Sequence, residues 1–345
     1  MKVLYAIRNP YGLGADRWIY DGYKNAFLAE GHQFYTITEL DNFQKKVYAI
    51  KPDLFLLDFC FLEKNVPKLS YDTLLNLKKE GTKIFCSTDA GLDKENPQEK
   101  RIALFRKYVS LFDLCFSSNA PETMSYFEGM FQKPIYFLPH SADTAIYYPD
   151  KPDPRFSDCD IAFVGSFYTQ KKTQFEQLLL PLLNKHRVCI YGQGRGLKDK
   201  ILRVGGGITR RLKLPFLMKA INSARITISP DDERKLYASA AICVNIHEYY
   251  NDGASKGQSV EREFKVPASG GFQISDYCIG MERYFELGRE IVAVKTPEEW
   301  FKAIDYYLKN EKARKEIQER GTARVLKEHT RRHRVKELVE ICRRG

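Results

Sequence analysis

Short apolar runs alternate with amphipathic stretches from residue 1 to residue 138. The run Val3-Leu4-Tyr5-Ala6-Ile7 has the continuous apolar character of a buried strand, and residues 16–30 have the apolar spacing of a helix. The same reasoning predicts further strands at Gln33–Ile37, Leu54–Asp58, Lys83–Ser87, Leu114–Ser117 and 135–138, with helices at Tyr71–Lys79 and 122–129. Apolar strands interleaved with amphipathic helices predict a parallel sheet that is covered on both faces.

A proline-rich stretch separates this pattern from a second one. Residues 139–157 contain four prolines and no periodicity, which is typical of a connection between domains. Beyond it we predict strands at 160–165, 187–192, 226–229, 242–246, 271–274 and 291–294, and helices at 298–309, 311–320 and over a basic stretch that ends near Cys342. The sequence thus predicts an α/β protein with two Rossmann-like, doubly wound domains. Their expected boundaries are 1–145 and 158–321, with a linker at 146–157 and a basic C-terminal helix at 322–345 that packs back on the first domain.

Length and composition agree with two globular domains. A chain of 345 residues, 43% of them hydrophobic and 13% aromatic, has enough apolar side chains for two cores. No run resembles a signal peptide or approaches the roughly 20 apolar residues that span a bilayer. We therefore expect a cytoplasmic protein that at most rests on a membrane surface. The eight cysteines are scattered without a CxxC pair, which predicts reduced, buried thiols.

Positive charge is concentrated in two segments. The net charge is +11; residues 195–225 hold nine Lys and Arg against one Asp, and residues 312–345 hold twelve against five acidic residues. Such segments attract nucleotide phosphates, lipid phosphates or nucleic acid. Two macromolecular partners therefore stay open, nucleic acid and an anionic membrane surface. The alternative is that these basic residues only solvate helix surfaces.

Polar residues follow three of the strands predicted in the second domain, where doubly wound domains bind their ligands. The first of these strands ends in Gly165-Ser166, with Lys171 shortly after, a combination that suits a diphosphate. Gly192 begins a second glycine-rich strand end at the same edge. Asn245 and His247 follow a third strand, where a histidine can contact a phosphate or a sugar hydroxyl. The alternatives are an ordinary turn with solvent-exposed lysines and a structural histidine.

The residues from 262 to 272 form a further motif in the second domain. They predict the start of a helix, a turn at Ser269-Gly270-Gly271 and a strand that begins near Phe272. A turn without bulky side chains lets backbone N–H groups approach an anion, so we expect these amides to hold a diphosphate. Polar residues of the preceding helix, namely Arg262, Glu263 and Lys265, are expected to face the same ligand, and Phe272 is expected to belong to the same donor site.

The first domain offers its own candidates. Asp89 follows the fourth predicted strand, and a carboxylate at a strand end can act as a general base toward a hydroxyl. The alternative is a helix-capping role. Gly12, Gly14 and Asp16 form a polar loop after the first strand. Asp158-Cys159-Asp160 has the letters of a DxD metal motif, but it precedes a strand whereas such ligands follow one, so we expect no metal.

These pieces, in their order and spacing, resemble the CgeB-like (spore maturation protein) glycosyltransferases of the GT-B fold. The likeness is good from about 138 to 335 and looser before. Its matching runs are Leu138-Pro139-His140-Ser141-Ala142-Asp143, Phe163-Val164-Gly165-Ser166, Leu236-Tyr237-Ala238-Ser239-Ala240, Asn245-Ile246-His247, 262–272, Tyr284-Phe285-Glu286-Leu287-Gly288-Arg289-Glu290, Gly321 and His329-Thr330.

The resemblance implies that the two domains face each other across a cleft. It implies a nucleotide sugar held by the C-terminal domain, an acceptor at the N-terminal domain beside Asp89 and the loop of Gly12, Gly14 and Asp16, no obligatory metal and no tightly bound cofactor. The strand end at Asp89 is similar to the place where the more distantly related phage DNA glucosyltransferases carry a catalytic Asp. This likeness implies a base at Asp89 and inversion at the sugar carbon.

One position departs from the family. There the phenylalanine of the motif is followed by a Glu that hydrogen-bonds the ribose of the donor, whereas this chain has Lys265. Lysine cannot accept those hydrogen bonds. Either Glu261 or Glu263 replaces the missing carboxylate, or Lys265 contacts phosphate in an altered donor pose.

We therefore predict a glycosyltransferase that moves a hexose-type sugar from a nucleotide diphosphate sugar to a hydroxyl acceptor. A UDP-sugar is the expected donor, and the acceptor is a glycan, a lipid-linked molecule or another hydroxyl compound. Two alternatives stay open. One is a DNA-base glucosyltransferase of the phage type, and the other is a non-catalytic nucleotide-binding or nucleic-acid-binding relative that lost the ribose Glu.

Overall fold

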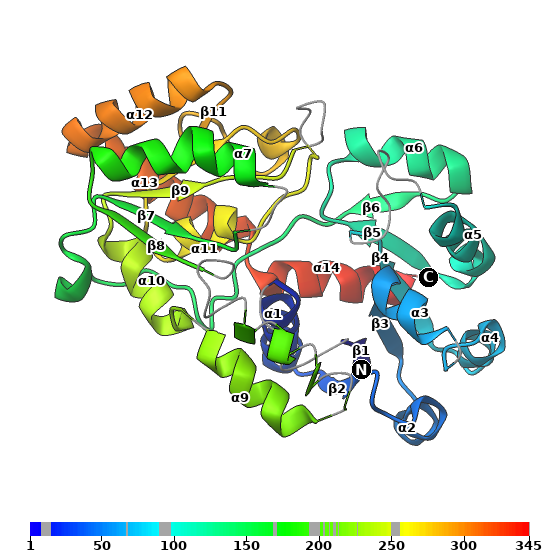
Figure 1. Ribbon diagram of the computed structural model, residues 1–345. Helices are drawn as coiled ribbons and strands as arrows, with labels where there is room; N and C mark the ends of the chain where they lie inside the picture. Colours follow the sequence, from blue (N-terminus) through cyan, green and yellow to red (C-terminus); the bar gives the residue numbers. More distant parts are fainter. Residues whose placement is uncertain are drawn as a thin grey trace. The chain divides into compact units, whose positions relative to one another are not determined.

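The computed structural model divides the chain into two compact units. Unit 1 comprises residues 1–139 and 332–345, and unit 2 comprises residues 140–331. The structure describes residues 1–7, 15–66, 68–89, 98–167, 171–192, 201–202, 204–206, 208–209, 212, 214–225, 227–249 and 256–344. Figure 1 shows one parallel sheet in each unit, with helices packed on it.

Unit 1 contains a six-stranded sheet in the order β2-β1-β3-β4-β5-β6, and every neighbouring pair is parallel. Its strands are β1 (Lys2–Ala6), β2 (Gln33–Ile37), β3 (Leu54–Asp58), β4 (Lys83–Ser87), β5 (Leu114–Ser117) and β6 (Ile135–Phe137). Its helices are α1 (Ala15–Ala29), α2 (Phe43–Ile50), α3 (Phe59–Asn65), α4 (Tyr71–Lys79), α5 (Glu99–Tyr108), α6 (Pro121–Phe131) and α14 (Arg331–Arg344).

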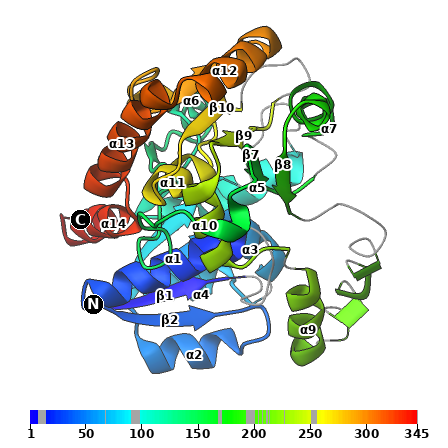
Figure 2. The ribbon, with the colours of Figure 1, turned by 90° about the vertical axis from the view of Figure 1, so that its left-hand side faces the viewer.

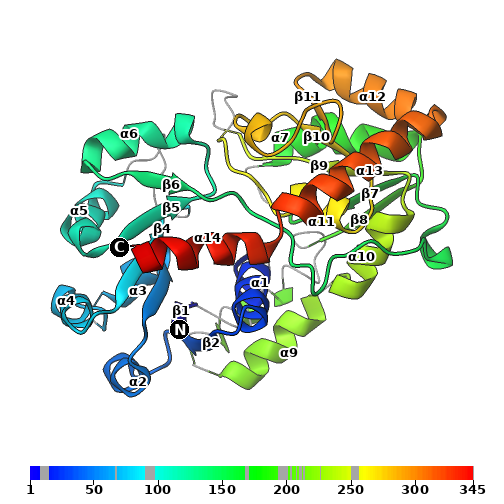
Figure 3. The ribbon, with the colours of Figure 1, turned by 180° about the vertical axis from the view of Figure 1, so that it is seen from behind.

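Alternate residues of these strands supply the two faces of the sheet. In β3, Phe55 and Leu57 pack with residues of α2 to α6, while Leu54 and Leu56 pack with α1 and α14. Val335 and Leu338 of α14 are fully buried in this second cluster. Figure 3 shows α1 and α14 together on one face of the sheet. The C-terminal helix is therefore part of the core of unit 1.

Unit 2 contains a five-stranded parallel sheet in the order β11-β10-β9-β7-β8. Its strands are β7 (Ile161–Val164), β8 (Val188–Tyr191), β9 (Ile242–Asn245), β10 (Gln273–Asp276) and β11 (Val292–Val294). Its helices are α7 (Lys172–Gln174), α9 (Pro215–Arg225), α10 (Pro230–Ser239), α11 (Arg262–Ala268), α12 (Pro297–Lys309) and α13 (Glu311–Glu328). Phe163, Val244 and Ile274 pack with Trp300 and Ile304 of α12 in one apolar core.

The predicted α/β class with two parallel sheets is confirmed, but one predicted strand is wrong. Residues 227–229 form a bend, and Ser229 caps α10 by accepting a hydrogen bond from the Asp232 amide at 3.1 Å. Pro230 and three acidic residues in the first turn favour a helix start here, which overrides the local apolar pattern.

Two other sequence expectations can be compared directly with the structure. All eight cysteines are free; seven of them are buried and Cys189 is partly buried, as expected for reduced thiols. Among the helices of the described residues, none combines the length and the apolar character needed to cross a bilayer.

Candidate functional site

Two glycines bring the ends of β7 and β8 into close contact. Gly165 follows β7 and donates its amide to Tyr191 O at 2.9 Å, and Gly192 follows β8 with φ of +145°. A Cβ built on Gly192 would lie 1.7 Å from Gly165 O, so the two backbones touch without space for a side chain. Only glycine fits this conformation and this approach. Ser166, next along the chain, is partly buried.

Arg262, the first residue of α11, reaches the same strand ends. Its Nη1 donates to Val164 O at 2.9 Å, its Nη2 donates to Ile246 O at 3.2 Å, and its Nε donates to Asn245 Oδ1 at 2.8 Å. A Cβ on Gly165 would lie 2.4 Å from Nη1, so Gly165 makes the space that the guanidinium occupies. The start of the 262–272 motif therefore meets the Gly165 turn.

Lys171 is the second cation at this edge. It is buried, and its Nζ donates to Ile246 O at 3.1 Å, the same carbonyl that Arg262 contacts. Burial, followed by the nearby Arg262 charge, lowers the pKa of Lys171 to about 8. Within the described residues, no carboxylate lies within ion-pair distance of either cation. Two closely spaced cations held by carbonyls leave positive charge available to an anionic ligand.

Asn245 links Arg262 to the sheet. It closes β9 in register with Ser275 of β10, and its Nδ2 donates to Ser275 Oγ at 3.0 Å while its Oδ1 accepts from Arg262. The side chain is fully buried. Asn245 thus holds the guanidinium in place, and its role in donor binding stays a prediction.

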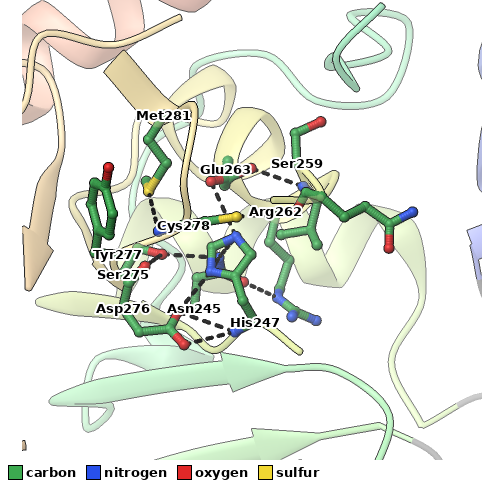
Figure 4. A network of polar contacts seen from close by, with 12 residues as sticks. Asn245, His247, Ser259, Arg262, Glu263, Ser275, Asp276, Tyr277, Cys278 and Met281 are labelled. Atoms are coloured by element: carbon green, nitrogen blue, oxygen red, sulfur yellow. Dashed lines mark hydrogen bonds and ion pairs between the residues drawn. The ribbon is translucent and has the colours of Figure 1, made fainter. Parts of the chain in front are cut away.

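His247 forms the centre of a buried charged cluster, which Figure 4 shows at close range. Its Nδ1 lies 2.7 Å from Asp276 Oδ1 of β10, and its Nε2 lies 3.2 Å from Glu263 Oε1 of α11. The His247 backbone amide also donates to both Asp276 oxygens at 3.0 Å. All three side chains are at most 6% exposed, so a ligand does not reach His247 directly.

The carboxylates set the charge of His247. Burial by itself lowers the pKa of His247, but Cys278 and the carboxylates of Asp276 and Glu263 outweigh it and raise the pKa well above its ordinary value. The ring therefore carries both protons at neutral pH and donates to both carboxylates. Glu263 also accepts from the Val260 amide at 2.8 Å and from Tyr284 OH at 3.2 Å. These contacts tie β9 and β10 to the beginning of α11.

The end of the 262–272 motif differs from the expectation. The Ser269, Gly270 and Gly271 amides donate to carbonyls of α11, at 2.9 to 3.1 Å, and so close the helix. Gly270 has φ of +79°, which suits a helix C-terminus. The amides that we expected to meet a diphosphate are thus used within the protein, at the amino end of β10, away from Gly165. Phe272 is a core residue that packs on Tyr307.

Lys265 occupies the position where the resembled family has Glu. Its Nζ lies 3.3 Å from Glu261 Oε2 and 4.9 Å from the centre of the Tyr147 ring. Glu261 also pairs with Arg331 at 3.3 Å. Glu261 and Glu263 are therefore both engaged with protein groups, and Lys265 is 6% exposed.

Asp89 lies at the end of β4 in unit 1. Its Oδ1 accepts from Ser117 Oγ at 2.7 Å and from the Ser118 amide at 2.5 Å, and its Oδ2 accepts from Ser87 Oγ at 3.2 Å. The carboxylate is partly exposed and ties β4 to β5. Three donors occupy three of its roughly four lone-pair positions, which leaves one for a further hydroxyl.

The remaining candidates give less structural information. Gly12 and Gly14 lie outside the described residues, as does the side chain of Asp16. Asp158 and Asp160 both pair with Arg187, at 3.0 and 3.2 Å, at the amino end of β7.

Two units that each contain a parallel sheet with helices agree with the two-domain GT-B fold. Residues 172–340 match the family model described as "Glycosyl transferase-like". This match covers just under half of the chain, and that part is similar to glycosyltransferases. No curated protein matches the chain in sequence. The narrower resemblance to the CgeB-like branch stays a prediction.

Solved structures of similar fold cover almost the whole chain. Sucrose-phosphate synthase from Thermosynechococcus elongatus aligns with a TM-score of 0.67 and 11% identity, over 99% of this chain and 98% of that one. HepE from Anabaena, solved with UDP and glucose, aligns at 0.61 and 11%, over 99% and 98%. An alpha-glucosyltransferase solved with UDP and a 13-mer DNA containing a HMU base aligns at 0.64 and 13%, over 99% of each chain. At these identities the likeness establishes a common fold.

Two contributors to the site were missing from the sequence prediction. Asp276 and Ser275 end β10 beside Asn245 and position His247 and Asn245. The signal that could have revealed them is a polar residue at the end of a buried strand, which is also the signal that predicted Asn245.

Proposed function

We propose that the chain transfers a hexose-type sugar from a UDP-sugar to a hydroxyl acceptor. The observation that carries the proposal is the pair of cations, Arg262 and Lys171, held at the carboxyl ends of β7 and β9 without a carboxylate partner among the described residues. Solved relatives of the same fold contain UDP or UDP-glucose, which supports uridine diphosphate as the nucleotide part of the donor.

Each cation has a defined task in this proposal. Arg262 is held by two carbonyls and Asn245, so its guanidinium is preorganised before the donor binds. Lys171 adds a second charge at the same Ile246 carbonyl. When the glycosidic bond to the sugar breaks, negative charge grows on the departing diphosphate, and fixed cations stabilise that charge. The Gly165–Gly192 contact holds the ends of β7 and β8 together beside these cations.

The test of donor binding is the affinity for UDP, measured by calorimetry, together with UDP release from UDP-glucose. We expect Arg262→Ala to weaken UDP binding at least about tenfold, since charge-assisted hydrogen bonds contribute roughly 1.5–3 kcal/mol each. Lys172→Ala is the matched control, because Lys172 is exposed and, among the described residues, pairs with Glu176 alone. Unchanged UDP binding in Arg262→Ala would contradict the proposal.

We further propose Asp89 as the base that takes the proton of the acceptor hydroxyl, which corresponds to inversion at the sugar carbon. Its position at a strand end and its one remaining lone-pair position support this role. Asp89→Asn keeps the hydrogen-bonding shape but cannot accept a proton. We expect it to abolish sugar transfer and to leave UDP affinity unchanged. Transfer at the parental rate would remove Asp89 from the mechanism.

A DNA base is the second candidate acceptor. It is supported by the likeness to the alpha-glucosyltransferase solved with DNA and by the basic segments 195–225 and 312–345. Transfer assays with hydroxymethylated duplex DNA and with glycan or lipid-linked hydroxyl acceptors separate the two. A steep loss of duplex binding with added salt would favour DNA.

A further inference from the structure

The stretch from residue 201 to residue 217 exposes an unusual number of apolar side chains. Seven large hydrophobic residues there are each at least 40% exposed, and Phe216 reaches 81%. They are Ile201, Val204, Ile208, Leu212, Leu214, Phe216 and Leu217. Elsewhere in the described part of the chain, exposed large hydrophobic residues occur singly or in pairs. A concentrated apolar surface of this kind marks a site of interaction.

This surface belongs to an excursion between β8 and α10 that is not needed to build the sheet. Its best-defined element is α9, whose Phe216 and Leu217 lie in the first turn and are both exposed. Figures 1 and 2 both show α9 apart from the five-stranded sheet of unit 2. The apolar side chains are therefore available to a partner without any change in the core of unit 2.

The same segment has a strongly one-sided charge. Residues 201–225 contain six Lys and Arg and no Asp or Glu. Basic and apolar residues alternate closely, as in the run Ile208-Thr209-Arg210-Arg211-Leu212-Lys213-Leu214. A segment with this composition is complementary to a surface that is negative on the outside and apolar immediately beneath.

We propose that the exposed apolar residues between Ile201 and Leu217 form a docking surface for an anionic lipid bilayer. Leu212, Phe216 and Leu217 enter the boundary between headgroups and acyl chains, and the positive charge that the sequence places in this stretch attracts lipid phosphates. The proposal is independent of sugar transfer, because it concerns a surface outside the strand-end site.

Two features favour a bilayer over the other partners of a basic surface. Nucleic acid would use the six basic residues, but duplex phosphates offer nothing to seven exposed aliphatic and aromatic side chains. A protein interface concentrates apolar residues in a core from which charged residues are depleted, whereas here both kinds alternate along the chain. A lipid interface uses both kinds at once, since apolar groups enter the bilayer while long basic side chains reach back to the phosphates.

The experiment is vesicle co-sedimentation of the full chain. The vesicles consist of phosphatidylcholine alone or mixed with phosphatidylglycerol, and duplex DNA is assayed in parallel. We expect binding to the mixed vesicles, weakening with added salt, and little binding to phosphatidylcholine. Phe216→Ser with Leu217→Ser should reduce binding at least about tenfold, because two apolar side chains no longer enter the bilayer.

The matched control is Leu180→Ser with Leu183→Ser, two exposed leucines of the same unit outside the segment. It should bind vesicles as the parent does. Circular dichroism and UDP affinity should be unchanged in both double variants, since all four side chains are exposed. Equal vesicle binding by parent and F216S/L217S, or no binding to anionic vesicles, would overturn the proposal. Binding to DNA alone, unaffected by F216S/L217S, would assign the basic residues to nucleic acid instead.

Discussion

At the scale of single residues, the site depends on a space left by a missing side chain. Gly165 has no Cβ, and the guanidinium of Arg262 occupies the volume that a Cβ would need. The same guanidinium lies over the Phe163 ring, and Arg262 Cζ is 5.3 Å from the centre of that ring. A change at Gly165 therefore acts on Arg262 rather than on the backbone turn alone.

We predict that Gly165→Ala weakens UDP binding about tenfold, equivalent to ~1.4 kcal/mol, because the added methyl would lie 2.4 Å from Arg262 Nη1 and 2.8 Å from Phe163 Cζ. Calorimetric titration with UDP measures the effect. Gly129→Ala is the control, since a Cβ there meets nothing within 4 Å. Parental affinity in Gly165→Ala would show that the guanidinium position does not matter for the nucleotide.

The lowered pKa of Lys171, about 8, predicts a pH dependence of donor binding. Diphosphate binds the charged amine, so UDP affinity should fall as the pH rises through about 8, approaching tenfold per pH unit. Lys171→Arg should flatten this dependence, because arginine stays charged, and Lys172→Arg should leave it unchanged. A parental profile in Lys171→Arg would assign the titration to another group.

The lowered pKa of Lys171 also affects the stability of the folded protein, but in the opposite direction to its effect on UDP binding. Between pH 8 and the ordinary value of 10.5, unfolded Lys171 holds a proton that the folded side chain has lost. Lys171 therefore makes the free energy of unfolding of the ligand-free protein increase as the pH rises through that window.

At the scale of elements, the buried His247 cluster joins β9, β10 and α11. The imidazolium pairs with both Asp276 and Glu263, and Glu263 is adjacent to Arg262 at the beginning of α11. The direction of α11, and with it the reach of Arg262, depends on this electrostatic connection. Lys265 and Glu261 form a second connection on the same helix.

We predict that His247→Ala lowers the free energy of unfolding by about 3–5 kcal/mol, because it leaves two buried carboxylates without their cation. Since the folded pKa of His247 is raised, its stabilisation is complete below the ordinary value of 6.5 and is lost as the pH rises through the higher folded value. Urea unfolding at several pH values measures both effects. His186→Ala, which removes a 3.9 Å pair with the exposed Asp305, should cost far less. Equal losses in the two variants would contradict the role of the cluster.

Most elements follow from local pattern, and the exception is instructive. The predicted strands at Gln33–Ile37, Leu54–Asp58 and Lys83–Ser87 agree with β2, β3 and β4 to the residue, because each is a short apolar run between polar turns. The strand predicted at 226–229 was wrong because Ser229 and Pro230 start a helix. A cap signal of this kind outweighs a short apolar run.

At the scale of the molecule, the last helix of the chain belongs to the core of the first unit. Val335 and Leu338 of α14 pack with Val3 of β1 and Phe27 of α1. Unit 1 is therefore built from both ends of the chain, and unit 2 from the continuous segment between them.

We predict that Leu338→Ala destabilises unit 1 by about 2–5 kcal/mol, the usual cost of removing a fully buried leucine side chain. Hydrogen exchange should accelerate in residues 1–139 and 332–344 and stay parental in residues 140–331. Leu236→Ala, at an equally buried position of α10 in unit 2, should give the reverse pattern. Uniform acceleration throughout the chain in both variants would show that the two units do not open separately.

The sequence by itself determined the α/β class, the two parallel sheets and the strand ends at Gly165, Gly192 and Asn245, because apolar periodicity and turn chemistry are local properties. It did not determine how the 262–272 motif is divided. Arg262 donates to Val164 O, 98 positions earlier in the chain, whereas the amides of Ser269, Gly270 and Gly271 donate to carbonyls of α11 and close that helix. The partners of these three amides and of the Arg262 guanidinium are residues that approach them only when the chain has folded. That choice belongs to the tertiary structure.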